Sequence, residues 1–136
     1  MSGSQSVIGG AGTFHYDAIG TNDFMVGTHG NDYFYAGKGN DTMVGGAGDD
    51  VFYGGAGADT FIFVGNGTDG ISTFGTDIIN DFAVKQGDKL RFSGGIDPED
   101  VTFQQLSYGT YVKVEGYGAI FLNNVVGASH AYFVFA

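Results

Sequence analysis

Aspartate recurs at every ninth position over part of the chain, and this spacing is the feature best suited to chemistry. Short carboxylates among glycines offer oxygen ligands with little bulk, which is the donor set that Ca²⁺ prefers. One aspartate in a turn is explained by hydrogen bonds to its own backbone. Five at a fixed position, in a chain of 136 residues with 15 acidic and 5 basic residues, favour cation binding instead. The five candidate ligands are Asp23, Asp32, Asp41, Asp50 and Asp59.

These aspartates belong to a tandem repeat of nine residues, in which the sixth residue is aspartate and the eighth is large and apolar. The blocks are Ala18–Val26, Gly27–Tyr35, Ala36–Val44, Gly45–Tyr53 and Gly54–Ile62, and their eighth residues are Met25, Phe34, Met43, Phe52 and Phe61. Six glycine-rich residues can form a tight turn, and three residues of high β propensity can form a short strand. Repetition at a short fixed period predicts a solenoid of stacked coils.

If two blocks make one coil, residues 18 apart in sequence stack on each other, and the parallel strands of neighbouring coils lie about 4.8 Å apart. Asp23, Asp41 and Asp59 then form one column, and Asp32 and Asp50 form a second. Bare carboxylates at that spacing repel. Two calcium–oxygen bonds of about 2.3–2.6 Å placed end to end cover the same spacing, whereas the shorter bonds and strict octahedron of Mg²⁺ fit it less well. The stacked pairs predict at least three Ca²⁺ ions.

The blocks resemble the glycine- and aspartate-rich nonapeptide of RTX proteins, G-G-x-G-x-D-x-U-x. The resemblance implies an all-β fold, in which a right-handed parallel β-roll carries the calcium sites. It also implies that backbone carbonyls of the turns complete those sites. The carbonyls that the resemblance assigns are those of Thr28, Gly30, Gly37, Gly39, Gly46, Gly48, Gly55 and Gly57.

The segment after the repeats resembles the D-x-I-x-D-F-x-x-G-x-D-x-I-D-L stretch that follows the repeats in secreted RTX proteases and in the R-modules of alginate epimerases. The matching residues are Asp77, Ile78, Asp81, Phe82, Gly87, Asp88 and Leu90, and Arg91 stands where the family has aspartate. Asp77 is a candidate calcium ligand that closes the last coil; the alternative is a role in capping the turn.

Alternating apolar and polar residues predict four antiparallel strands in the C-terminal part, over residues 101–106, 111–115, 119–122 and 132–135. They are expected to cover the open end of the roll, because exposed sheet edges invite aggregation. The sequence thus predicts a β-roll over residues 1–63, beginning with a degenerate repeat at Gly9–Asp17, and a C-terminal antiparallel β cap of the same module over residues 64–136.

Several function classes are disfavoured. A net charge of −10 argues against nucleic-acid binding, and the chain has no apolar run of 18 residues, so no membrane span is expected. Neither G-x-S-x-G, a phosphate loop nor H-E-x-x-H occurs, and the three histidines lie far apart in sequence. We therefore expect a non-catalytic module.

The expected function is calcium binding coupled to folding, because a small core and a glycine-rich chain need the ion to become stable. The RTX resemblance implies a secreted, extracellular module that is exported by a type I secretion machinery. It also implies a covalently linked catalytic domain, such as an epimerase, protease or lipase, or an adhesive domain. The ending Tyr132–Ala136 resembles the short apolar endings of type I secretion substrates, and an ordinary last strand explains it equally well.

An alternative function rests on the outward-facing positions seven and nine. One face of the predicted roll carries Tyr33, Tyr35 and Tyr53, and tyrosines on a flat sheet can stack on sugars. This pattern indicates a module that binds polysaccharide, or an adhesin piece that associates with itself.

Overall fold

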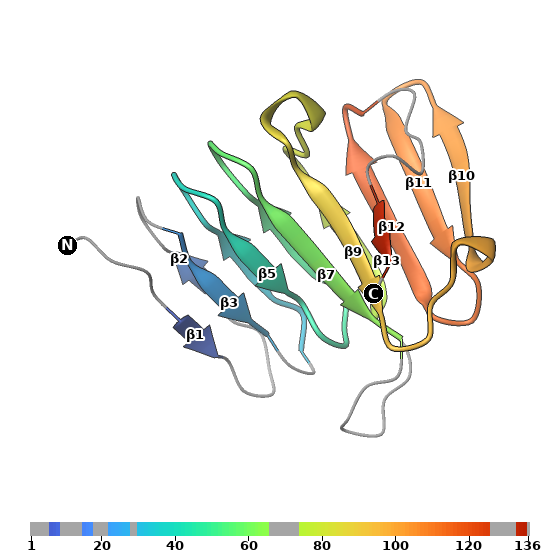
Figure 1. The fold of residues 1–136 in the computed structure, drawn as a ribbon, viewed down its shortest axis with the longest axis horizontal. Coiled ribbons are helices and arrows are strands. Elements are labelled where there is room, and N and C mark those ends of the chain that lie inside the picture. The colour runs from blue at the N-terminus through green and yellow to red at the C-terminus, as the bar shows by residue number, and fades with distance from the viewer. Residues whose placement is uncertain are drawn as a thin grey trace.

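The computed structural model describes residues 6–8, 15–17, 22–27, 30–65, 74–125 and 133–135, and these form two facing β-sheets (Figure 1). Sheet A contains, in spatial order, β1 (Ser6–Ile8), β3 (Phe24–Val26), β5 (Thr42–Val44), β7 (Thr60–Val64), β9 (Lys89–Ser93) and β13 (Phe133–Phe135). Sheet B contains β10 (Val101–Leu106), β11 (Gly109–Val114), β12 (Gly118–Asn123), β8 (Gly75–Ile79), β6 (Val51–Tyr53), β4 (Tyr33–Tyr35) and β2 (His15–Asp17). Two short 3₁₀ helices, η1 (Val84–Gln86) and η2 (Pro98–Asp100), lie in connections. Among the described residues, no helix has the length and apolar character needed to cross a membrane.

The repeats alternate between the two sheets, as the nine-residue period predicts. Successive strands of one sheet are parallel and offset by 18 residues, so that Met25 pairs with Met43 and Met43 with Phe61 in sheet A. In sheet B, Phe34 pairs with Phe52 in the same way. Two blocks therefore make one coil, and equivalent residues of successive coils form straight rows.

The parallel coils continue beyond the last recognisable repeat. Strand β8 pairs with β6 and strand β9 with β7, both parallel and with the repeat register preserved. The offset grows to 27 residues between Asp50 and Asp77 and to 29 between Asp59 and Asp88, because the connections are longer. We therefore propose that the boundary between roll and cap lies after Ser93 rather than after Phe63.

The C-terminal strands extend the sheets edge to edge. Strands β10, β11 and β12 form the predicted antiparallel meander, and β12 joins it to the roll by pairing parallel with β8. These findings confirm an all-β fold with a parallel roll and a C-terminal antiparallel region. The prediction was wrong for the last strand, because β13 pairs parallel with β9 in sheet A. That pairing brings the ring of Phe133 to 5.4 Å from the ring of Phe92, inside the core. Tyr132, the first residue of the predicted strand, lies outside the described residues.

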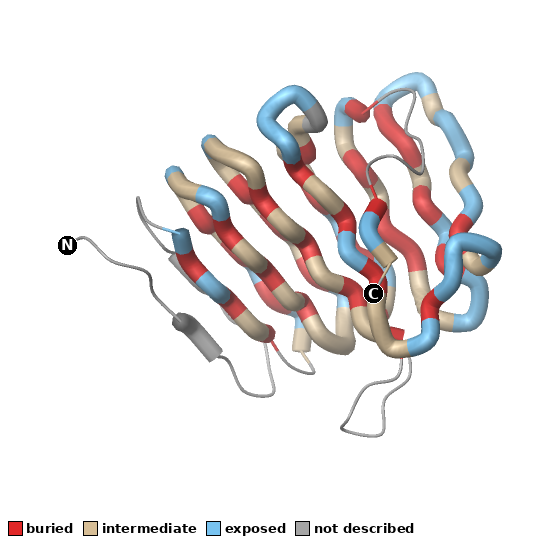
Figure 2. Tube along the Cα trace, in the orientation of Figure 1, coloured by how far each residue is buried: buried red, intermediate tan, exposed pale blue. Residues whose placement is uncertain are grey.

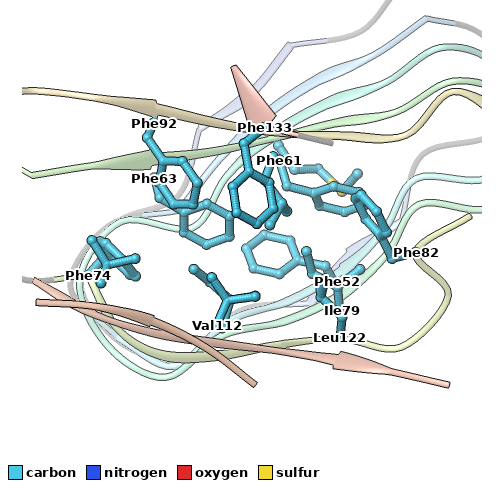
Figure 3. Packing of buried hydrophobic residues seen from close by; sticks show 14 of the residues in the cluster. Phe52, Phe61, Phe63, Phe74, Ile79, Phe82, Phe92, Val112, Leu122 and Phe133 are labelled. Carbon is cyan, nitrogen blue, oxygen red and sulfur yellow. The ribbon is translucent and has the colours of Figure 1, made fainter. Parts of the chain in front are cut away.

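The core lies between the sheets. All five eighth-position side chains are fully buried, and buried residues alternate with more exposed ones along strands β3 to β9 (Figure 2). In the repeats, each strand contributes one inward side chain, and the rings of Phe34 and Phe52 stack at 4.9 Å. After the repeats the core is larger and aromatic. Figure 3 shows side chains from both layers meeting there, among them Phe63, Phe74, Phe92 and Phe133.

Candidate metal centre

The aspartates form the two columns that the repeat predicts, and hydrogen bonds join successive members of each column. In one column, Asp41 Oδ1 accepts a hydrogen bond from the backbone N–H of Asp23 at 2.8 Å, and Asp59 Oδ1 accepts one from Asp41 at 2.9 Å. In the other column, Asp50 Oδ1 accepts from Asp32 N–H at 2.8 Å. Each carboxylate therefore reaches back over one strand spacing, and one of its oxygens remains for another partner.

Asp77 and Asp88 extend these columns by one coil each. Asp77 Oδ1 accepts from Asp50 N–H at 2.8 Å, and Asp88 Oδ1 accepts from Asp59 N–H at 2.9 Å. The sequence singled out Asp77 as a candidate ligand but gave Asp88 no role. A signal was present, since Asp88, Lys89 and Leu90 repeat the order of aspartate, variable residue and apolar residue found at positions six to eight.

The second oxygen of four of these carboxylates is buried in an unusual way. In Asp41, Asp50, Asp59 and Asp77, Oδ2 is inaccessible to solvent and accepts no hydrogen bond from the described residues. Burial raises the pKa of Asp41 to about 6 and the pKa values of Asp50 and Asp59 to about 8, and the neighbouring carboxylates add to the increase. The pKa of Asp77 is raised well above its usual value for the same reason. An ionised oxygen in this position needs a positive partner.

Glycines at the first position of the turns make room beside these oxygens. A Cβ atom added at Gly45 would collide with Asp50 Oδ2, and one added at Gly54 would collide with Asp59 Oδ2. Carbonyl oxygens also face the space between turns, because a Cβ at Gly55 would collide with the carbonyl oxygen of Gly37 and one at Gly57 with that of Gly39. In the same way, a Cβ at Gly48 would collide with the carbonyl oxygen of Gly30, and one at Gly75 with that of Gly48. Thr28 lies outside the described residues.

In four turns, the side chain at position five accepts a hydrogen bond from the following coil. Asn22 Oδ1 accepts from Asn40 N–H at 2.7 Å, and Asn40 Oδ1 accepts from Ala58 N–H at 2.9 Å. Asn31 and Asp49 make the equivalent bonds in the other column, to Asp49 N–H and Thr76 N–H. Position five therefore reaches forward by one coil while position six reaches back, and the two together fix the spacing between turns.

This arrangement fits a hard divalent cation. The donors are carboxylate and carbonyl oxygens only, which suits Ca²⁺. In the described ranges, no three side chains of His, Cys, Asp or Glu come together as a metal site. A site here would therefore combine stacked carboxylates with backbone carbonyls.

The comparison with known proteins agrees with this geometry. The family model of the RTX calcium-binding nonapeptide repeat, which spans four copies, matches residues 18–51, 26–61 and 35–71. The chain contains RTX calcium-binding nonapeptide repeats. The sequence resemblance to RTX proteins is thereby confirmed, and with it a calcium-binding, non-catalytic module.

Two solved structures resemble the RTX module over most of its length, the R3 and R2 subunits (AlgE6R3 and AlgE6R2) of the mannuronan C5-epimerase of Azotobacter vinelandii. Each has a TM-score of 0.61 and 26% sequence identity. The R3 match covers 92% of this chain and 79% of that subunit, and the R2 match covers 100% and 92%. No curated protein sequence matches the chain.

Gly55→Ala should weaken folding and calcium binding far more than Gly116→Ala. Both glycines have a positive φ, 86° and 82°, so alanine costs about 1–2 kcal/mol in backbone strain at either position. At Gly116 nothing lies within 4 Å of the added carbon, whereas at Gly55 it meets the Gly37 carbonyl between two turns. Urea unfolding in saturating calcium and calcium titration measure the two effects. Equal losses in the two variants would contradict this role for Gly55.

Without calcium, the roll should lose stability as pH rises from about 5 to 8. The buried carboxyls of Asp50 and Asp59 have a pKa of about 8 in the cation-free fold, whereas aspartate in an unfolded chain ionises near 3.9. Between these values the folded form holds more protons than the unfolded chain, so the cation-free fold becomes less stable as pH rises. Circular dichroism in the presence of chelator, at a series of pH values, measures the folded fraction. A cation-free β signal that increases between about pH 5 and 8 would contradict the prediction.

Proposed function

We propose that this RTX module binds Ca²⁺ between successive turns and folds because it binds it. The buried Oδ2 atoms of Asp41, Asp50, Asp59 and Asp77 carry the proposal, together with the turn carbonyls beside them. Each site takes the carboxylates of two stacked turns and carbonyls from the turn glycines. The assigned carbonyls remain those of Thr28, Gly30, Gly37, Gly39, Gly46, Gly48, Gly55 and Gly57.

The stacked pairs define the number of sites. We call two aspartates that are stacked next to each other in a column a step. The repeats contain three steps, Asp23–Asp41, Asp41–Asp59 and Asp32–Asp50. A fourth step, Asp50–Asp77, is supported by the same backbone hydrogen bond to Asp77 Oδ1 and by the same buried Oδ2 in Asp77. Four ions are therefore proposed, one at each step.

The coupling to folding follows from the cost of burial. A carboxylate without a partner in a protein interior must either stay ionised, which costs several kcal/mol, or take up a proton that the unfolded chain has released, which costs up to about 4 kcal/mol at neutral pH. At least four such groups occur here. The total stability of a domain is only about 5–15 kcal/mol. At neutral pH the cation-free roll cannot carry that cost, so the ion contributes the folding free energy.

This coupling suits a module that is exported unfolded. Calcium is scarce inside cells, and extracellular modules bind it at about 10⁻⁴–10⁻³ M. We infer that the chain stays loose during passage through a type I secretion channel and becomes rigid outside. There it supports the folding and stability of a larger secreted protein. The similarity to R subunits of a mannuronan C5-epimerase makes a linked polysaccharide-modifying domain one such partner.

Removal of calcium should abolish the β signal in circular dichroism, and calcium but not magnesium should restore it. Asp50→Asn removes a carboxylate shared by two proposed sites, so the calcium midpoint should rise at least about tenfold. Asp97→Asn is the matched control, because Asp97 is an exposed acid in a turn outside both columns. A full β signal in the presence of chelator at neutral pH, or equal midpoints in both variants, would contradict the proposal.

A second candidate function is polysaccharide binding on the outer face of sheet B. Register places Tyr33, Val51, Ile78, Phe121 and Tyr111 in one row across five strands. The row ends beside a hollow of about 350 Å³ that Thr76, Tyr111, Lys113 and Tyr117 help to line. Tyr35 and Tyr53 are less suited to stacking on sugars, because their rings stack on each other at 4.7 Å and cover one face of each ring.

The double variant Tyr33→Ala/Tyr111→Ala should lose retention on a polysaccharide gel if this face binds glycan. Phe24→Ala is the control, because Phe24 is an exposed aromatic residue on the outer face of sheet A. Affinity electrophoresis in calcium, with mannuronan and a neutral glucan as probes, measures retention. Unchanged retention of the double variant, or no retention of the unaltered protein, would remove this candidate.

A further inference from the structure

The last turn of the roll, residues 81–88, differs from the repeat turns on which it stacks. It connects β8 to β9 and lies at the same edge of the molecule as the turns before β5 and β7 (Figure 1). It is longer than the six-residue turn Gly54–Asp59 beneath it, and it contains η1. The second of its two aspartates, Asp88, occupies the register of position six, because Lys89 pairs with Thr60 in the adjacent strand.

The two oxygens of Asp88 both have donors from the chain. Oδ1 accepts from Asp59 N–H at 2.9 Å, as in every other step of the columns. Oδ2 accepts from Ala83 N–H at 2.8 Å, within its own turn. In Asp41, Asp50, Asp59 and Asp77, the corresponding Oδ2 is buried and accepts no hydrogen bond from the described residues. The longer turn therefore supplies an N–H group where the repeat turns leave an oxygen for a cation.

Two further side chains of the last turn face the backbone of the turn beneath. Asp81 accepts from Gly54 N–H and Gly55 N–H, each at 2.8 Å, and Gln86 Oε1 accepts from Gly57 N–H at 2.8 Å. The remaining N–H groups of that turn are also bonded, Ala56 to the Gly37 carbonyl, Ala58 to Asn40 and Asp59 to Asp88. All six N–H groups of the turn Gly54–Asp59 are thus accepted by protein oxygens.

We propose that the Asp59–Asp88 step is closed without a cation, and that Asp81, Gln86 and Asp88 form a closing clamp that takes the place of an ion. The two columns then end differently. The column that ends at Asp77 keeps a calcium site at its last step, whereas the column that ends at Asp88 has its last site at the Asp41–Asp59 step. This inference rests on the proposed calcium sites, and it makes Asp88 a positioning residue rather than a ligand.

Counting bound ions in two matched variants tests the closing clamp. Asp77→Asn and Asp88→Asn each remove a charge from a fully buried terminal carboxylate, and native mass spectrometry of the full chain in calcium gives the number of ions bound. Asp77→Asn should bind one ion fewer than the unaltered protein. Asp88→Asn should bind the same number as the unaltered protein, although it melts at a lower temperature because the single amide oxygen of asparagine cannot accept from both Asp59 N–H and Ala83 N–H.

The loss of one ion in Asp88→Asn would overturn the closing clamp and leave calcium binding at the repeats intact. An absence of bound calcium in all three proteins would instead contradict the proposed function. If Asp88→Asn does not fold, the test is hydrogen exchange of the backbone amides in the calcium-loaded unaltered protein. The Ala83 amide should then be protected by its bond to Asp88, and rapid exchange of that amide would overturn the clamp.

Discussion

The structure depends on one constraint, that an ionised oxygen placed beside a glycine turn and cut off from water requires a positive partner. Four carboxylates in two columns place an oxygen in that situation. The nine-residue period, the glycines at position one and the carbonyls aimed at the next coil all serve to create the same space. A side chain at those glycines would fill the space beside the carboxylate oxygen. Turns between stacked strands repeat that space once for every strand spacing, which a helix would not do. Under the proposed function the metal is thus a part of the fold and not an addition to it.

Stability is distributed unevenly along the roll. In the repeats, each three-residue strand buries a single side chain, which is little apolar area against the entropy of a glycine-rich chain. From Phe63 onward the sheets enclose an aromatic cluster that includes Phe74, Phe92 and Phe133. The proposed ions would therefore contribute most where the core is thinnest. The closing clamp lies at the transition between the two regions, where hydrogen bonds from side chains take over from the cation.

Much of this architecture could be predicted from the sequence, because a fixed period translates directly into register. The columns of aspartate and the burial of Met25, Phe34 and the other eighth-position residues follow from an offset of 18. Offsets of 27 and 29 could not be predicted, since the longer connections conceal that Asp77 and Asp88 continue the columns. The parallel pairing of β13 could not be predicted either. Alternation of apolar and polar residues indicates which side of a strand is buried, but it does not indicate the direction of the neighbouring strand. Opposite hydrogen-bonding directions at positions five and six depend on side-chain torsions that a periodic pattern does not contain.

The most direct test of a cation between the coils is a crystal structure of the protein grown in calcium, with the ions located by anomalous scattering. We expect anomalous peaks about 2.3–2.6 Å from Oδ2 of Asp41, Asp50, Asp59 and Asp77, with turn carbonyl oxygens completing each coordination shell. A well-ordered roll in which those four oxygens accept hydrogen bonds from water, with no anomalous peak between the turns, would contradict the central role of the ion.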